Sequence, residues 1–256
     1  MKKTVKAIYL LISSLVISLL HLPLAFGKTG SANKLFYRSA ISAAPTLPNS
    51  SLLISPVKSV YDSLQLGPAG LSRQAFDYAL QGYEKLVSQG KLINQSIIAI
   101  VDFSQPSSHK RLYVLDIKNY KILFNTLVAH GRNSGKEWAT YFSNKATSHQ
   151  SSPGFYITGQ AYSGSNGYSL KLDGVENGIN DKAMKRAIVI HGADYVSESY
   201  VSSQGYIGRS RGCPAVPLKE ARNIINAMRD GACLYIYTPD KRYFSHSAML
   251  ADNLKG

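Results

Sequence analysis

Short apolar runs, rich in β-branched and aromatic residues, recur between residues 97 and 239, and clusters of polar residues separate them. Runs of this length bounded by turn residues are typical of β-strands. The turn around Asn119 predicts a tight hairpin connection. The pattern predicts seven strands, over residues 97–103, 111–117, 121–130, 154–160, 168–174, 187–193 and 233–239.

Two other stretches repeat their apolar residues every three to four positions, as amphipathic helices do. The first begins at Ser72, a residue type that caps helix N-termini, and ends before Gly90. The second covers about residues 218–228, and a short helix is predicted over residues 181–186. Together these elements predict one mainly β domain over residues 72–240, with a helix packed at each end.

The N-terminus has the layout of a secretory signal peptide over residues 1–27. Three lysines precede an apolar run from Ala7 to Leu20, and small residues at Ala25 and Gly27 precede a cleavage point. The run is shorter than the roughly 18–20 residues that span a membrane comfortably. We therefore expect cleavage, export to the periplasm or cell envelope, and no stable membrane insertion afterwards. An uncleaved membrane anchor is the alternative.

Two segments are predicted to lie outside the folded domain. Residues 28–71 are rich in Ser, Ala, Pro, Leu and Gly, which is typical of a linker. We expect this segment to be partly disordered, with one short helix near residues 57–66. Residues 241–256 are expected to form a peripheral C-terminal tail.

The chain of 256 residues carries 29 Lys and Arg against 15 Asp and Glu, a formal net charge of +14. Removal of the signal peptide would lower this charge to +11, because residues 1–27 hold three lysines and no acid. Such a basic excess indicates a polyanionic partner. The basic residues are scattered and no nucleic-acid motif is present, so we predict no nucleic-acid partner and favour an acidic polymer of the cell envelope. The alternative is that the charge serves only solubility.

One cysteine and one histidine form a candidate for nucleophilic catalysis. His191 ends an apolar strand, and Cys213 follows a glycine-rich loop that carries Arg209 and Arg211. Positive charge near a helix start lowers the pKa of a thiol, which predicts a reactive thiolate at Cys213. His191 would accept the thiol proton, and Gly212 would turn backbone N–H groups towards a tetrahedral intermediate. The alternative from these residues alone is a small buried cysteine and a structural histidine.

The flanking sequence resembles a known family. His191-Gly192, followed by Ser210-x-Gly212-Cys213, is similar to the signature of the murein L,D-transpeptidase (YkuD-type) catalytic-domain family. The likeness covers about residues 72–238, in the successive blocks VAHGRNSG (128–135), FSN (142–144), QSSPGFYITG (150–159), YSGSNGYSLKLDG (162–174), RAIVIHGADYV (186–196) and GRSRGCPAV (208–216). The combination is highly specific, whereas any one block would not be.

The resemblance implies a β-sandwich or barrel with a few packed helices, and a cysteine acyl-transferase of peptidoglycan that needs no cofactor. Cys213 would attack the carbonyl on the L-centre of the third stem-peptide residue and expel the terminal D-amino acid. His191 would act as base and then as acid. An amine of a neighbouring stem would resolve the thioester into a 3→3 cross-link, whereas a free D-amino acid would give exchange. The alternatives are hydrolysis by water, as in an L,D-carboxypeptidase, and a non-catalytic wall-binding protein.

The resemblance also implies roles for residues around this pair. The N–H groups of Gly212 and Cys213 would form an oxyanion hole, and a backbone carbonyl near Gly192 would orient the imidazole. Many members carry an arginine two residues after the cysteine, where this chain has Ala215. Arg209 or Arg211 would then take over its role by pairing with a substrate carboxylate. The residues expected to shape the loop or contact the substrate are Ser210, Arg209, Arg211 and Tyr195.

Three further residues have structural explanations. His130 also precedes a glycine and is expected to order its loop. Cys233 is typical of a buried strand residue, and a disulfide with Cys213 is the alternative. Asp181 is expected at a helix N-terminus, and a contact with Arg186 or with a substrate amine is the alternative. No metal site is predicted, because neither an HxxxH nor an HExxH spacing occurs.

Overall fold

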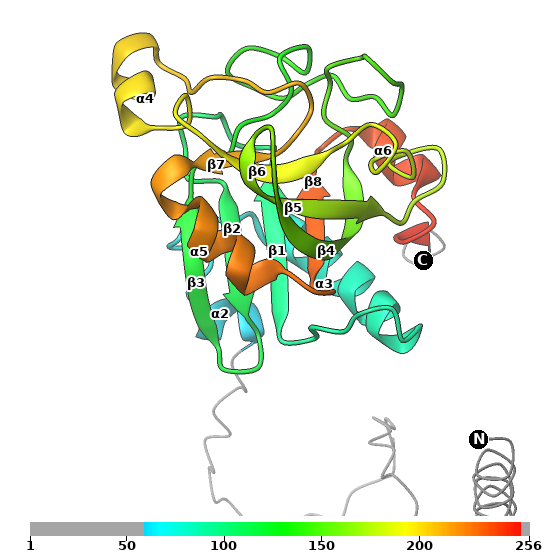
Figure 1. Ribbon diagram of the computed structural model, residues 1–256. Coiled ribbons are helices and arrows are strands. Elements are labelled where there is room, and N and C mark those ends of the chain that lie inside the picture. Colours follow the sequence, from blue (N-terminus) through cyan, green and yellow to red (C-terminus); the bar gives the residue numbers. More distant parts are fainter. Residues whose placement is uncertain (1–58, 252–256) are drawn as a thin grey trace, which may run out of the picture. The chain divides into compact units, whose positions relative to one another are not determined.

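The computed structural model describes residues 59–251. The predicted signal peptide and most of the predicted linker lie outside the described residues. One sheet of eight strands has the order β3-β2-β1-β8-β4-β5-β6-β7 (Figure 1). The strands are β1 Ile97–Asp102, β2 Leu112–Asp116, β3 Lys121–Thr126, β4 Gly154–Gly164, β5 Gly167–Gly174, β6 Val189–Ala193, β7 Ala215–Pro217 and β8 Cys233–Tyr237.

The described residues also form helices α2 Val60–Ser63, α3 Arg73–Ser88, α4 Glu198–Gln204, α5 Leu218–Met228 and α6 Lys241–His246. Helix α3 begins as predicted, because the Ser72 hydroxyl accepts a hydrogen bond from Ala75 N–H at 3.2 Å. The predicted hairpin is also present between β2 and β3, where Asn119 N–H donates to the Asp116 carboxylate at 2.9 Å.

The two edges of the sheet are joined by the chain that follows β3. Ala129 N–H donates to Ala215 O of β7 at 2.8 Å, and Arg132 N–H donates to Ser210 O at 2.8 Å. These contacts form isolated bridges to the opposite edge of the sheet, which makes the sheet a nearly closed barrel. The predicted mainly β fold, a sandwich or barrel with a few packed helices, is confirmed.

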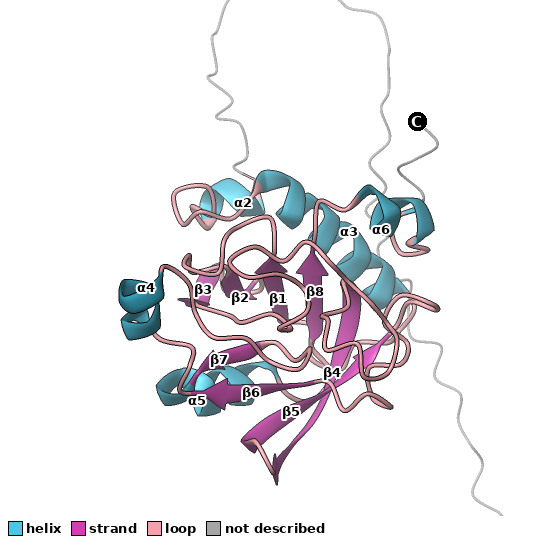
Figure 2. Ribbon diagram, turned by 90° about the horizontal axis from the view of Figure 1, so that it is seen from above, coloured by secondary structure: helices cyan, strands magenta, loops and turns pink. Residues whose placement is uncertain are grey.

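Side chains of the central strands point alternately to two cores. In β1, Ile97, Ala99 and Val101 belong to the inner core, whereas Ile98 and Ile100 belong to the outer one. Helix α5 packs into the inner core, and α2, α3 and α6 lie together over the outer face (Figure 2). Because both faces are covered, the strand appears in the sequence as a continuous apolar run.

The seven predicted strands and the two longer helices are confirmed, with shifted ends. The helix predicted over residues 181–186 is wrong, because the chain forms successive turns there. Three elements escaped the sequence patterns: β7, α4 and α6, with three, seven and six residues. Segments this short do not show a reliable period.

The folded domain extends beyond both predicted boundaries. Leu64, Leu66 and Leu71, which we assigned to a linker, are buried in the outer core. Tyr243 and Leu250, which we assigned to a peripheral tail, are buried in the same core. Both assignments were wrong for these segments. A few separated apolar side chains fill the outer face, and their spacing is too sparse to reveal this in the sequence.

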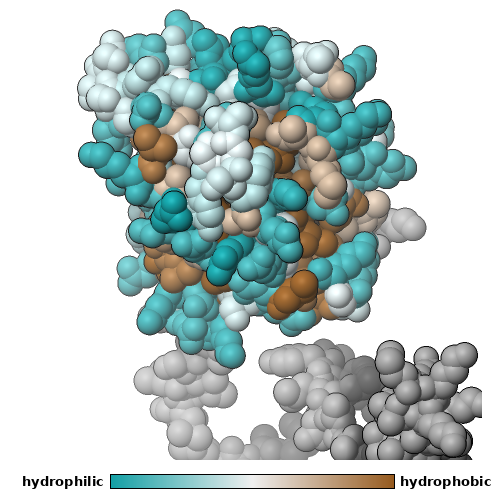
Figure 3. Space-filling model, viewed as in Figure 1, coloured by the Kyte–Doolittle hydropathy of each residue, from teal (hydrophilic) through white to brown (hydrophobic). Residues whose placement is uncertain are grey.

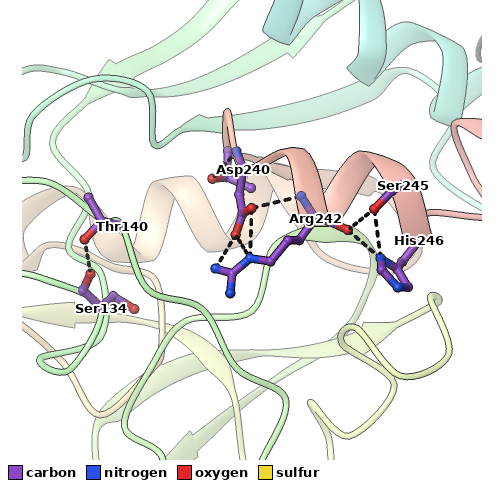
Figure 4. Close-up of polar contacts among 7 residues, drawn as sticks. Ser134, Thr140, Asp240, Arg242, Ser245 and His246 are labelled. Atoms are coloured by element: carbon purple, nitrogen blue, oxygen red, sulfur yellow. Dashed lines mark hydrogen bonds and ion pairs between the residues drawn. The ribbon is translucent and has the colours of Figure 1, made fainter.

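Local contacts hold helix α6 on the sheet. The Asp240 carboxylate accepts from Arg242 N–H at 2.9 Å and pairs with the Arg242 guanidinium at 2.8 Å, which caps the helix start (Figure 4). Below the helix, the buried Glu176 carboxylate accepts from Phe155 N–H at 2.8 Å and from the Tyr243 and Ser247 hydroxyls. The C-terminal segment is therefore part of the domain.

The surface seen in the orientation of Figure 1 is mainly hydrophilic, and its hydrophobic residues lie among hydrophilic and intermediate ones (Figure 3). Scattered patches of this kind are normal on a protein in water. Within residues 59–251, none of the helices has the length and apolar character needed to cross a membrane.

Gly82 allows α3 to lie close to the sheet, and we predict that alanine there destabilises the fold. A Cβ at this position would lie 2.1 Å from Cζ of Phe155. Phe155 cannot move easily, because it is fully buried and stacks on Tyr235 with ring centroids 4.2 Å apart. We expect Gly82→Ala to lower the free energy of unfolding by about 1–3 kcal/mol, against the gain in helix propensity.

Urea unfolding of the full chain checks this prediction. Glu84→Ala is the matched control, because Glu84 is exposed on the same helix. A Gly82→Ala protein as stable as the parent would contradict the close packing of α3 on β4.

Candidate active site

The predicted cysteine and histidine face the same cavity, which has a volume of about 480 Å³. Strands β6 and β7 run parallel, and their register places His191 opposite Ala215, two residues beyond Cys213. Strand pairing therefore brings together two residues that are distant in the sequence. A larger cavity, of about 570 Å³ beside β3 and the start of α5, is lined by no cysteine or histidine.

Cys213 lies in the loop before β7 and is only 8% exposed. Val189 N–H donates to its sulfur at 3.5 Å, and the thiol donates to Ala187 O at 3.7 Å. Burial raises the pKa of the Cys213 thiol, and the Val189 N–H and the Arg186 guanidinium offset this only in part. The predicted lowering of the thiol pKa was wrong, because β7 follows the cysteine and helix α5 begins only at Leu218.

His191 lies within β6, and its side chain is oriented by the backbone. Its Nδ1 is 2.9 Å from Gly192 O, and a carbonyl oxygen can only accept, so Nδ1 carries a proton and Nε2 is the nitrogen left to act as a base. Glycine is required at position 192, because a Cβ there would lie 2.8 Å from Cβ of Ala221 on α5. No hydrogen bond within residues 59–251 joins His191 to Cys213, although both line the cavity.

Ser210 and Gly212 set the shape of the loop before the cysteine. Gly212 has φ of 123°, and a Cβ there would lie 2.9 Å from Gln150 O. The Ser210 hydroxyl donates to Cys213 O at 2.6 Å and accepts from Gly212 N–H at 3.0 Å, while Ser210 N–H donates to His130 O at 2.9 Å. The structure does not support Gly212 N–H as an oxyanion donor, because this N–H is already bonded. Among the described residues, Cys213 N–H has no such partner.

The other side chains predicted to contact the substrate differ in their exposure and in their contacts with the rest of the domain. Arg209 donates to Gly135 O at 3.1 Å and lies over the Tyr206 ring at 5.8 Å. Arg211 is exposed and lines the cavity. Tyr195 also lines the cavity, and burial raises the pKa of its phenol to about 12, so the hydroxyl stays protonated at neutral pH.

Comparison with protein families matches residues 68–237 to the L,D-transpeptidase catalytic domain. The chain belongs to this family. The match covers about two thirds of the sequence and includes both His191 and Cys213. Members of the family are enzymes that act on peptidoglycan. A comparison with curated protein sequences returned no match.

Solved L,D-transpeptidases are similar to this chain only at a distance. One from Mycobacterium smegmatis is 11% identical with a TM-score of 0.36, over 56% of this chain and 59% of that one. L,D-transpeptidase 3 from Mycobacterium tuberculosis is 12% identical with a TM-score of 0.35, over 56% and 61%. One from Stackebrandtia nassauensis is 13% identical with a TM-score of 0.34, over 71% and 76%. This chain spans about three fifths of the length of the two mycobacterial proteins, and the family assignment rests on the sequence match.

Arg186 is a residue of this L,D-transpeptidase domain whose place in the site the sequence did not reveal. Its guanidinium donates to Ser143 O at 2.8 Å, Ser152 Oγ at 2.6 Å and Gln150 O at 2.7 Å, and it lies near the Cys213 sulfur. The alternative contact between Arg186 and Asp181 is absent, because the Asp181 carboxylate accepts from Asn144 and Gly178.

No local pattern distinguishes Arg186 from the other basic residues, because its partners lie more than thirty positions away.

Arg111 and His130 form a buried polar pair beneath the loop that carries Ser210. Arg111 Nη2 donates to His130 Nδ1 at 2.8 Å and to Val128 O at 3.0 Å, and its Nη1 donates to Gln105 O at 2.8 Å. Burial lowers the pKa of Arg111 to about 9. Burial, with the Arg111 charge second, lowers the pKa of His130 to about 3. His130 therefore orders its loop as a neutral ring, as predicted for a structural histidine.

The second cysteine of this domain does not reach the first. Cys233 belongs to the outer core and Cys213 to the inner one, and both thiols are free. The disulfide alternative is therefore wrong. Within the described residues, no group of three His, Cys, Asp or Glu side chains is placed to hold a metal ion.

Proposed function

We propose that this domain transfers the acyl group of peptidoglycan stem peptides through a thioester on Cys213. The observation that carries the proposal is that Cys213 and a His191 ring oriented by the Gly192 carbonyl line one cavity. The family match supports the same reaction class. The substrate is the peptide bond between the L-centre of the third stem residue and a terminal D-amino acid.

The reaction has two halves, acylation of Cys213 and transfer of the acyl group from Cys213 to an amine. In the first, His191 Nε2 takes the thiol proton while Sγ attacks the carbonyl, and Cys213 N–H donates to the oxyanion. Collapse of the tetrahedral intermediate breaks the C–N bond, and His191 returns the proton to the leaving amine. In the second half, His191 deprotonates an incoming amine, which displaces the thiol and forms the new amide bond.

The need for a base follows from the environment of the sulfur. Burial raises the pKa of the Cys213 thiol, so the thiol is protonated at neutral pH. The proton on Nδ1 of His191 leaves Nε2 as the acceptor on the same ring. His191 thus converts the Cys213 thiol to the thiolate only as the sulfur attacks the carbonyl.

The experiment that tests the proposal is incubation of the full chain with disaccharide-tetrapeptides, followed by product analysis by mass spectrometry. Released D-alanine with cross-linked dimers supports transfer. Released D-alanine with tripeptide alone identifies the hydrolase alternative, in which water resolves the thioester. No release of D-alanine at all would favour the non-catalytic wall-binding alternative and contradict the proposal.

His191→Ala is expected to slow acylation of Cys213 by a carbapenem about 10²–10⁴-fold at pH 7, because the base is lost. The residual rate should rise with pH towards the raised pKa of the thiol, since only the thiolate then reacts. The rate of acylation is measured at several pH values from the appearance of the adduct in mass spectra. His109→Ala is the control, because His109 is exposed outside the cavity. An unchanged acylation rate in His191→Ala would refute the base role.

We also propose that the protein is exported to the periplasm or cell envelope after cleavage before Lys28. The support is the sequence layout of residues 1–27, with three lysines, an apolar run and small residues before the cleavage point. Mass spectrometry of the mature N-terminus tests this. Met1 retained in the membrane fraction would identify the uncleaved-anchor alternative.

A further inference from the structure

The cavity at Cys213 is positively charged. Four arginines line it, Arg132, Arg186, Arg209 and Arg211, and no aspartate or glutamate does. A side cavity of about 210 Å³ shares Arg186 and Arg211 and adds only Thr147 and His149. None of the ion pairs among the described residues involves these arginines. Such a site concentrates anionic groups.

Three of the four guanidinium groups are held by the protein itself. Arg186 donates to the backbone and hydroxyls of the loop over residues 143–152. Arg132 donates to His149 Nδ1 at 2.6 Å, and Arg209 donates to Gly135 O at 3.1 Å. These bonds fix the three groups in place and use part of their donor capacity.

Arg211 differs from the other three. It is exposed, and its guanidinium donates no hydrogen bond within residues 59–251. It lies two residues before Cys213 and borders both cavities. A guanidinium offers donors in a planar fork that matches a carboxylate. An unengaged fork at the border of the cavity that Cys213 lines is therefore placed for a carboxylate of the substrate.

We infer that Arg211 binds the terminal carboxylate of the D-amino acid that leaves the donor peptide, at the junction of the two cavities. This assignment rests on the proposed function, which defines the leaving residue. The terminal carboxylate is on the carbon bonded to the scissile nitrogen, so it stays close to Cys213 in any reactive pose. The other carboxylates of a stem peptide are further from the scissile bond. Arg211 thus makes the site selective for a free C-terminus.

Binding to the full chain carrying Cys213→Ala tests this without turnover. Three disaccharide-tetrapeptides are compared by calorimetry: one with a free terminal D-alanine, one with a terminal D-alanine amide, and one amidated on another carboxylate of the stem. We expect the free terminus to bind about 10- to 100-fold more tightly than the terminal amide, since a charge-assisted contact is lost. Amidation elsewhere should have a smaller effect.

In the Cys213→Ala protein, the additional substitution Arg211→Gln should remove the preference for the free terminus. It should leave the affinity for the terminal amide unchanged. Arg211→Lys should keep part of the preference, because the charge remains. Arg229→Gln is the matched control, because Arg229 is a half-exposed arginine at the end of α5, outside both cavities. Thermal unfolding verifies that each variant is folded.

Three outcomes would overturn the assignment: equal binding of the free and amidated termini, a preference that persists in Arg211→Gln, or a larger effect of amidation elsewhere on the stem. Release of D-alanine by the protein with Cys213 intact is measured separately. Selective binding without release contradicts the proposed function alone, whereas release without selectivity contradicts the role of Arg211 alone.

Discussion

Replacing Cys213 by alanine is expected to abolish both release of the terminal D-amino acid and covalent acylation by a carbapenem. The thiol is the nucleophile of the proposed reaction, and neighbouring groups cannot replace it. We expect the rate to fall by about 10⁴-fold or more, as when the nucleophile of a covalent mechanism is removed. The fold should persist, because alanine keeps the Cβ in the inner core and the change removes only two long hydrogen bonds of the sulfur, with Val189 N–H at 3.5 Å and Ala187 O at 3.7 Å.

Cys233→Ala provides the matched control for this experiment. Cys233 is the other cysteine of the chain, and it is fully buried in the outer core, where burial raises the pKa of its thiol. Its replacement leaves a small cavity and should change stability rather than acylation. Intact-mass measurement after exposure to the carbapenem distinguishes the two variants. An adduct that forms on Cys213→Ala but not on Cys233→Ala would reverse the assignment of the nucleophile.

The second large effect is expected on stability in acid, and it arises from His130. Burial and the charges of Arg111 and Arg209 lower the pKa of His130 from 6.5 to about 3, while its bond to Gly135 O acts in the opposite direction. Between these pH values the unfolded chain binds the proton and the folded chain does not. The contribution of His130 to the free energy of unfolding is therefore fully present above pH 6.5. It is lost as the pH decreases towards 3, by about 4 kcal/mol in total.

His130→Gln should remove most of this acid sensitivity, because its amide oxygen can accept from Arg111 and does not titrate. Urea unfolding of both proteins between pH 3 and pH 7 measures the difference. The effects of other titratable groups are the same in both proteins and cancel in the comparison. Glu176 is one such group: burial raises its pKa, so its effect on the pH dependence of stability is opposite in sign to that of His130. Parallel stability curves for the two proteins would show that His130 is not held neutral by the fold.

Much of the fold could be predicted because the central strands are buried on both faces. Strands such as β1 and β8 are continuous apolar runs, and α3 and α5 have a clear helical period. The boundaries were less predictable. Leu66 and Tyr243 fill the outer core from segments with no period of their own, so only the packed structure reveals their role.

The sequence predicted two residues that line one cavity, but it did not predict the electrostatics of the candidate site. His191 and Cys213 each lie in a short motif of contiguous residues, so the family resemblance predicted both. The pKa of the thiol depends instead on burial among distant segments, and the prediction of a lowered pKa was wrong. Arg186 escaped detection for the same reason, since its hydrogen-bond partners come from the loop over residues 143–152.

The sequence by itself determined the mainly β fold and the family, and it predicted the pair His191 and Cys213, because local patterns and short motifs carry this information. The tertiary structure decided which groups are available for chemistry. In the folded chain Gly212 N–H donates to Ser210 and three arginines are held by hydrogen bonds, whereas Arg211 is left unengaged at the border of the cavity that Cys213 lines. Whether a donor or a titratable group can act on a substrate depends on its hydrogen-bond partners and on its burial. Both are set by segments that are distant in the sequence, so local sequence patterns do not reveal them.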